Sequence, residues 1–85
     1  MMLCTGVPRF YFNLRNDVFV DDQEGAELPD LAAARARAEG FARDMAAASV
    51  IDHGRIDMRH RIEVADESRQ TLLTVTFGDV VRIEG

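Results

Sequence analysis

Apolar side chains recur every three to four residues between Leu28 and Val50, the longest periodic stretch in the chain. This spacing predicts one amphipathic α-helix that buries a single face. The expected buried face contains Leu31, Ala34, Ala38, Phe41, Ala42, Met45 and Ser49. Pro29 suits the first helical turn, where its missing N–H costs nothing, and Asp30 can cap free backbone N–H groups.

The back of this helix carries a row of small residues: Ala33, Ala36, Gly40 and Ala47. Alanine is the best helix former, so propensity alone explains it on a solvent-facing side. Propensity does not explain Gly40, because glycine costs about 1 kcal/mol relative to alanine inside a helix. A second interpretation therefore stays open, in which Ala36 and Gly40 pack closely against the helix of a second protomer.

Before the helix, apolar and polar residues alternate over residues 8–14 and predict a strand. Its expected core-facing residues are Phe10, Phe12 and Leu14. A tight turn at residues 16–17 then leads to a short return strand over residues 18–20. We expect a two-residue loop, which puts Leu14 opposite Phe19 and turns Phe19 toward the core, whereas a three-residue loop would reverse this arrangement.

After the helix, Gly54 marks the stop and residues 51–57 are predicted to form a loop. Alternation over residues 58–65 and 71–77 predicts two further strands joined by a turn. Their expected core-facing residues are His60, Ile62, Val64, Leu73, Val75 and Phe77. The last segment, residues 78–85, either forms an extra strand or is a tail.

The order of elements is ββαββ, which predicts a two-layer α+β sandwich. Its sheet has four mainly antiparallel strands, because each hairpin is local, and one long helix covers one face. The chain of 85 residues makes one domain, residues 8–77, preceded by a disordered tail over residues 1–7. The core of so small a domain is thin, so association with another chain would add stability.

These segments resemble a family of short bacterial proteins that carry a domain of unknown function. The resemblance rests on the segments PRFYFNL, DDQEGAELPDLAAARARAE, RIEVADES and LLTVTF, in that order. It spans residue 8 to about residue 77. Family members commonly have glycine where this chain has Asp17, and again in the last turn, where it has Ser68 and Arg69. The resemblance implies the fold and the strand register, and it implies no activity.

The formal net charge of −5 argues against nucleic acid as a partner, because phosphate binding requires a basic surface. The single cysteine, Cys4, excludes an internal disulfide and fits a reducing, cytoplasmic setting. No apolar run approaches the about 20 residues that span a membrane.

An acidic stretch leads from the first hairpin to the helix. Its acids are Asp17, Asp21, Asp22, Glu24, Glu27 and Asp30. Carboxylates at this density could hold Ca²⁺ or Mg²⁺, but their spacing is not that of an EF-hand. We interpret residues 21–27 as a solvated loop that complements the helix N-terminus and protects the edge of the second strand.

No catalytic or metal site is expected elsewhere. The pairs His53 with Asp52 and His60 with Asp57 contain metal-ligand types, but in a spacing that matches no known motif. Three side chains are candidate nucleophiles that lack a recognisable base: Cys4, Ser49 and Ser68. We therefore predict no catalytic residues, no metal and no cofactor.

Two surfaces remain for partners. One is a basic cluster of Arg55, Arg59, His60, Arg61, Arg69 and Arg82, which we interpret as charge pairing on a solvated sheet face, and alternatively as a face for an acidic partner or RNA. The other is the outer sheet face, which is rather apolar for a solvated surface and holds Tyr11, Val18, Val20, Leu72, Thr74 and Thr76. The short strand over residues 18–20 is also open to strand addition.

The sequence thus predicts a non-enzymatic protein-interaction or regulatory module that acts as a homodimer or with another protein. The predicted interaction surface comprises Tyr11, Val18, Val20, Ala36, Gly40, Arg59, Arg61 and Leu72. An antitoxin-like regulator linked to nucleic acid is the alternative by fold analogy, followed by a small enzyme or metal-binding protein.

Overall fold

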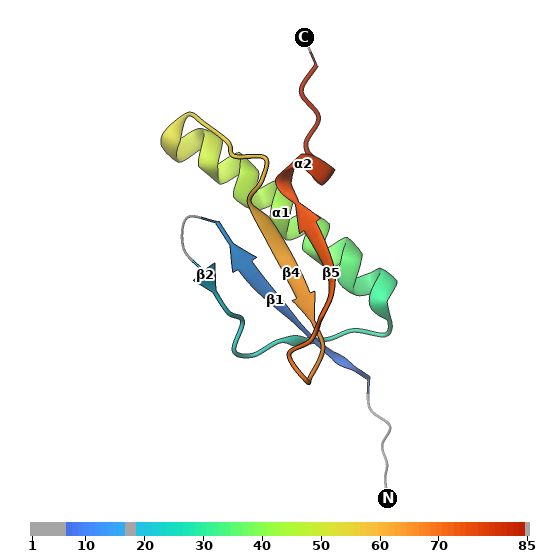
Figure 1. The fold of residues 1–85 in the computed structure, drawn as a ribbon. Coiled ribbons are helices and arrows are strands. Elements are labelled where there is room, and N and C mark those ends of the chain that lie inside the picture. Colours follow the sequence, from blue (N-terminus) through green and yellow to red (C-terminus); the bar gives the residue numbers. More distant parts are fainter. Residues whose placement is uncertain (1–6, 17–18, 85) are drawn as a thin grey trace, which may run out of the picture.

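The computed structural model describes residues 7–16 and 19–84. Its elements are β1 (Arg9–Arg15), β2 (Phe19–Val20), β3 (Ala26–Glu27), α1 (Leu31–His53), β4 (Arg61–Ala65), β5 (Thr71–Thr76) and α2 (Phe77–Val80). The strands pair antiparallel in the order β2-β1-β4-β5, and β3 pairs with the N-terminal end of β1. The long helix α1 crosses one face of this sheet, which confirms the predicted two-layer α+β sandwich (Figure 1). The expected tail apart from Val7, Asp17 of the expected turn and Val18 of the expected return strand lie outside the described residues.

The expected register of the first hairpin is wrong. Leu14 pairs with Val20 and Arg15 pairs with Phe19, so three residues separate the paired ends of the two strands. Val20 therefore shares the α1 side of the sheet with Leu14. Phe19 stands on the opposite side, where the Arg15 guanidinium lies 5.0 Å from the centre of its ring. This cation–π contact gives the exposed aromatic ring a partner outside the core.

The acidic segment contains a strand that the sequence pattern did not predict. In β3, Ala26 pairs with Phe10 and Glu27 pairs with Arg9. Leu28 follows as a buried core residue, and its N–H donates to the carbonyl of Pro8 at 3.1 Å. The chain therefore runs along β1 before it enters the helix, and Leu28 anchors this approach instead of belonging to the helix.

Helix α1 begins and ends later than predicted. Asp30 is the N-cap, as expected, and its Oδ1 accepts from the Ala33 N–H at 2.8 Å, so Pro29 precedes the cap instead of occupying the first helical turn. Gly54 is the C-cap in the left-handed conformation, with φ of 69°. Residues 51–53 are helical and not a loop, because Gly54 is the first residue that readily ends the helix in this way.

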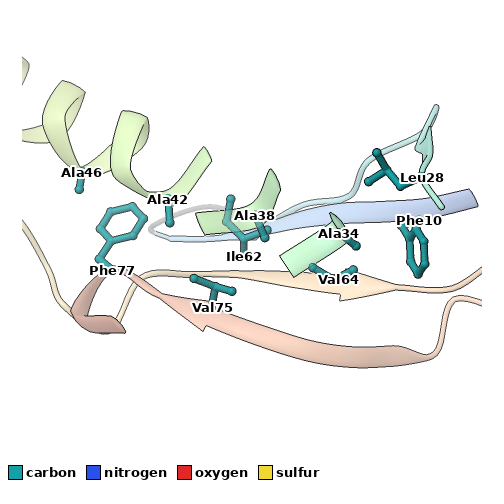
Figure 2. Close-up of a cluster of buried hydrophobic side chains, with 10 residues drawn as sticks. All are labelled: Phe10, Leu28, Ala34, Ala38, Ala42, Ala46, Ile62, Val64, Val75 and Phe77. Atoms are coloured by element: carbon teal, nitrogen blue, oxygen red, sulfur yellow. The ribbon is translucent and has the colours of Figure 1, made fainter. Parts of the chain in front are cut away.

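The buried face of α1 is a row of alanines, Ala34, Ala38, Ala42 and Ala46, packed on side chains of the sheet and α2 (Figure 2). The facing core residues are Phe10, Leu28, Ile62, Val64, Val75 and Phe77. Leu31 and Phe41 were expected in this face but are exposed, at 42% and 39%. A stripe with a spacing of four residues turns slowly around the helix, so Phe41 lies at its margin, in edge-to-face contact with Phe12 at 5.4 Å.

The C-terminal strands are shorter than predicted. Residues 58–60 form a turn, because the backbone N–H of Arg59 donates to the Asp57 carboxylate and that of His60 to the Asp57 carbonyl. β5 ends at Thr76, which caps α2 in a reciprocal pair of hydrogen bonds with Asp79, of 3.1 and 2.8 Å. Phe77 is buried as expected, although it opens α2. Residues 78–80 continue this short helix, and residues 81–84 follow without helix or strand structure.

Candidate interaction surfaces

The residues predicted as one interaction surface do not form one patch. Tyr11, Arg61 and Leu72 lie on the outer sheet face, and Ala36 and Gly40 lie on the exposed back of α1. Val20 lies on the α1 side of β2, and Arg59 lies in the turn before β4. Val18 is outside the described residues. A Cβ added to Gly40 would meet no atom within 4 Å, so the back of the helix is open there.

The outer sheet face is crossed by a chain of ion pairs. Arg15 binds Asp21 at 2.8 Å and Glu63 at 3.1 Å, and Glu63 also binds Arg61 at 3.1 Å. Arg15 and Arg61 stand directly opposite each other on β1 and β4. Glu63 bridges these two like charges, which would otherwise repel. Arg61 is therefore part of a balanced network, as the charge-pairing interpretation predicted.

Other members of the predicted basic cluster also contact acids. Arg59 forms two side-chain hydrogen bonds with Asp57, of 3.0 and 3.1 Å, and these bonds lower the pKa of the Asp57 carboxyl far below its usual value. Arg82 contacts Glu84 at 3.5 Å. Arg55 lies in the segment after α1, and Arg69 in the turn between β4 and β5. The cluster is distributed over four segments and does not follow one element.

Arg69 covers part of the outer face from a strained position. Its φ of 68° is in the left-handed region, which glycine adopts without strain and other residues rarely adopt. The guanidinium lies 3.9 Å from the centre of the Tyr11 ring, and Nη1 donates to the Asp22 carbonyl at 2.8 Å. Arg69 thus joins the last turn to β1 and to the acidic loop, which offsets the backbone strain.

The acidic loop closes the outer edge of β1 through Asp22. Its carboxylate accepts from the backbone N–H groups of Phe12 at 3.2 Å, Glu24 at 3.0 Å and Gly25 at 3.1 Å. The backbone N–H of Asp22 in turn donates to Asn13 Oδ1 at 3.0 Å. These bonds lie between the segments of β1 that pair with β2 and with β3, so one side chain replaces part of a strand.

Gly25 permits this closure because of its backbone conformation and its missing side chain. Its φ is +70°, and a Cβ there would come within 2.9 Å of the Phe10 carbonyl oxygen. Partial burial acts to raise the pKa of Asp22, but hydrogen bonds from the backbone of Gly25, Phe12 and Glu24 and the nearby Arg69 charge outweigh it, so the pKa is lowered. The acidic loop is therefore built around an ionised structural carboxylate.

A hollow of about 230 Å³ lies at the C-terminal end of α1. Its lining includes both histidines and both nearby aspartates of the sequence-based metal hypothesis: Asp52, His53, Asp57 and His60. Across the described residues, no group of three or more such side chains is placed to hold a metal ion. Ser49, also in the lining, donates its hydroxyl to the Arg55 carbonyl at 2.7 Å, so this serine closes the chain after the helix.

Two further features were not identified from the sequence. One is an apolar groove of about 360 Å³ beside α1, lined by Phe12, Leu14, Val20, Phe41, Met45 and Ile62, with Asp22 and Asp44. Its position depends on the hairpin register, which sequence alternation left open. The other is the free edge of β5, which has no strand partner on that side within the described chain. The absence of charge in Thr71–Thr76 is the signal that could have identified it.

Together these features define a small two-layer α+β domain with an open antiparallel sheet and one covering helix. The chain belongs to the DUF6894 family, a domain of unknown function, whose family model matches residues 9–78. This match confirms the resemblance drawn from the strand and helix motifs. No curated protein and no solved structure matches the chain significantly. No helix in residues 7–16 or 19–84 is long and apolar enough to cross a membrane.

Proposed function

We propose that this protein is a non-catalytic protein-interaction module that forms a homodimer through the free edge of β5. The proposal is carried by the composition of that edge, TLLTVT, which contains neither a charged residue nor proline. Edge strands of monomeric proteins are usually protected by charges, proline or a covering segment, because their free N–H and C=O groups invite pairing. The opposite edge consists of β1 closed by Asp22 and β3, and of the two-residue strand β2.

The hydrogen-bonding pattern of β5 supports a contact centred on Thr74. The Phe77 N–H donates to the His60 carbonyl at 2.8 Å, and Thr74 pairs with Glu63 three residues before Phe77. Antiparallel ladders alternate, so residues 73, 75 and 77 face β4 and the N–H and C=O of Thr74 face the free side. The Thr76 N–H binds Asp79, and the register shift at Val64/Ala65 ends the regular ladder near Leu72. The usable edge is thus centred on Thr74.

A two-fold axis through Thr74 would extend the sheet into a second copy of the chain. Thr74 would face the partner's Thr74 on the outer side, and Leu73 would lie beside the partner's Val75 on the α1 side. Such an isologous contact brings no like charges together. It also extends the thin core, since the apolar side chains of two β5 strands would cover each other.

The non-catalytic part of the proposal is supported by what the shifted carboxylates do. Hydrogen bonds lower the pKa of Asp22, Asp57 and Asp79, and each of these groups holds a turn, a cap or an edge in place. The guanidinium groups of Arg9 and Arg15 pair with Glu27 and Asp21, which favours a protein partner over a polyanion. The reducing cytoplasm is the compartment that we assign, on the basis of the single cysteine.

The test is disulfide trapping together with light scattering. In a Cys4→Ser background, Thr74→Cys should oxidise rapidly to a covalent dimer, because directly opposite residues of a hydrogen-bonded antiparallel pair lie about 5.5 Å apart at Cα, within disulfide reach. Ser68→Cys, in the exposed turn before β5, is the matched control and should remain monomeric. Light scattering after size exclusion should show a dimer that dissociates on dilution. A monomer at all concentrations, with equal trapping of the two variants, would disprove the dimer.

A further inference from the structure

The helical layer covers only half of the sheet. A helix with its side chains is about 10 Å wide and neighbouring strands are about 4.8 Å apart, so one helix covers about two strands. α1 packs over β4 and β5, and Figure 1 shows β2 standing clear of the helix. The inner side of β2 and of the adjoining C-terminal part of β1 therefore extends beyond the helix, and the apolar groove lies there.

Large apolar side chains that are not part of the hydrophobic core are exposed in the groove. Val20 is 50% exposed and Phe41 is 39% exposed, and neither belongs to the buried core cluster or to the partly buried residues packed against it. Leu14 also lies outside both groups. Phe12 and Phe41 meet edge to face at 5.4 Å, so one aromatic pair spans the sheet and the helix along the groove. Apolar side chains gathered in this way mark a contact surface.

The charged side chains that line the groove are all negative. Asp22 and Asp44 are its only charged side chains among the described lining residues. Asp22 stays ionised because backbone N–H groups bind its carboxylate. The whole chain carries a formal net charge of −5, so a second acidic chain would be repelled here. A complementary partner is apolar on one side and basic at its flanks.

We propose that this groove binds an amphipathic helix of another protein, with an apolar stripe flanked by Lys or Arg. A helix laid beside α1 over β1 and β2 would complete the helical layer, with anchors at i, i+3, i+4 and i+7 entering the groove. Its basic flanks would pair with Asp22 and Asp44. This inference goes beyond the proposed dimer and does not depend on it, since the free edge of β5 and the groove lie at opposite ends of the strand order. A dimer would present two such grooves.

The test uses three fluorescent 18-residue peptides in an anisotropy titration. The first is an amphipathic Leu/Lys helix, the second replaces every Lys with Glu, and the third has the first peptide's composition in an order without an apolar face. The amphipathic Leu/Lys peptide should bind at least tenfold more tightly than the other two. Equal binding of the Leu/Lys peptide and its scrambled form would show that the peptide's positive charge alone, without an apolar face, accounts for binding to this acidic protein. That result would overturn the proposal.

Two variants locate the binding site. Phe41→Glu, at an exposed helix position in the groove, should weaken the Leu/Lys peptide at least tenfold, whereas Leu72→Glu, at a comparably exposed position on the outer sheet face, should leave binding unchanged. Asp44→Lys should weaken the Leu/Lys peptide and strengthen the Leu/Glu peptide, a reversal that misfolding cannot produce. Equal effects of Phe41→Glu and Leu72→Glu would overturn the proposal. Thr74→Lys, which should break the β5 dimer, should not change peptide affinity. The dimer proposal and the groove proposal can therefore be disproved independently of each other.

Discussion

The two long edges of the sheet, at β1 and at β5, differ in how their outward backbone N–H and C=O groups are paired. At β1, Asp22 binds the Phe12 N–H, and β2 and β3 pair with the two ends of the strand. At β5, a strand of six uncharged residues, the side that faces away from β4 has no strand partner within the described chain. The difference indicates where this small domain excludes further strands and where it can accept one.

The contrast also changes the meaning of the acidic loop. Read as sequence, its carboxylates suggested a cation site or a solvated segment. In the fold, Asp30 caps α1, Asp21 and Glu27 pair with arginines, and Asp22 replaces a neighbouring strand. Acidic residues are therefore frequent in this loop because several of them have different structural roles near the same edge of the sheet.

The largest expected effect comes from breaking the closed edge at Gly25. Gly25→Ala forces a side chain into the left-handed region and places its Cβ 2.9 Å from the Phe10 carbonyl oxygen. It should lower the free energy of unfolding by more than about 2 kcal/mol. Gly54→Ala is the matched control, with φ of +69° and no atom within 4 Å, and should cost about 1 kcal/mol. Urea unfolding of both variants measures the difference, and equal costs would rule out the close approach.

Removing the carboxylate at the same edge should have the next largest effect. Asp22→Asn keeps one acceptor oxygen for three backbone N–H groups, so it should cost about 2 kcal/mol. Asp21→Asn removes an exposed ion pair with Arg15 instead and should cost less than about 1 kcal/mol. Thermal and urea unfolding at pH 7 will separate the two. Similar losses would mean that Asp22 acts only as one charge among several.

The Asp22 contribution should also depend on pH. Its folded-state pKa lies below the usual value of 3.8, so the stabilisation is complete well above that value and disappears as the pH falls through the folded pKa. The difference in unfolding free energy between the parent chain and Asp22→Asn should therefore be constant from pH 7 to about pH 5, and should narrow below about pH 4. Urea titrations at several pH values test this, and a difference that grows in acid would contradict it.

The smallest expected effect on stability comes from adding a charge to the open edge. Thr74 is exposed, so Thr74→Lys should change the monomer's unfolding free energy by no more than about 0.5 kcal/mol. The same change should abolish the dimer, because it places two positive charges at the two-fold axis. Dilute-solution unfolding combined with light scattering checks both results. A large loss of monomer stability would show that this edge is already covered within the chain.

The fold was predictable where alternation and caps act locally. Asp30 and Gly54 were recognised as a cap and a stop signal, although the helix was predicted over residues 28–50, about three residues too early at both ends. Alternation identified which side of β4 and β5 faces the helix. The hairpin register was not predictable, because two loop lengths fit the same letters and only the pairing of Leu14 with Val20 distinguishes them. β3 was missed because two residues are too few to show a period.

The contact surfaces were less predictable than the fold. Phe41 was assigned to the core from its place on the helix, but its burial depends on which strands lie beneath α1. The groove and the β5 edge likewise depend on strand order, which local patterns do not encode. Tyr11 and Leu72 were correctly placed on the outer face, yet the ion pairs and Arg69 that cover parts of this face come from distant segments.

The row of buried alanines on α1 affects what holds the helix at one position along its own axis. Shifting the helix by four residues, about 6 Å, would place each alanine of the row where its neighbour had been. The contacts of the buried face therefore do little to distinguish one axial position from the next. Contacts outside the alanine row therefore fix the position: Phe41 against Phe12 along the helix, Leu28 and Asp30 before it, and Gly54 after it. Lengthening either connection by a few residues should therefore release a sliding motion that the interior alone would not resist.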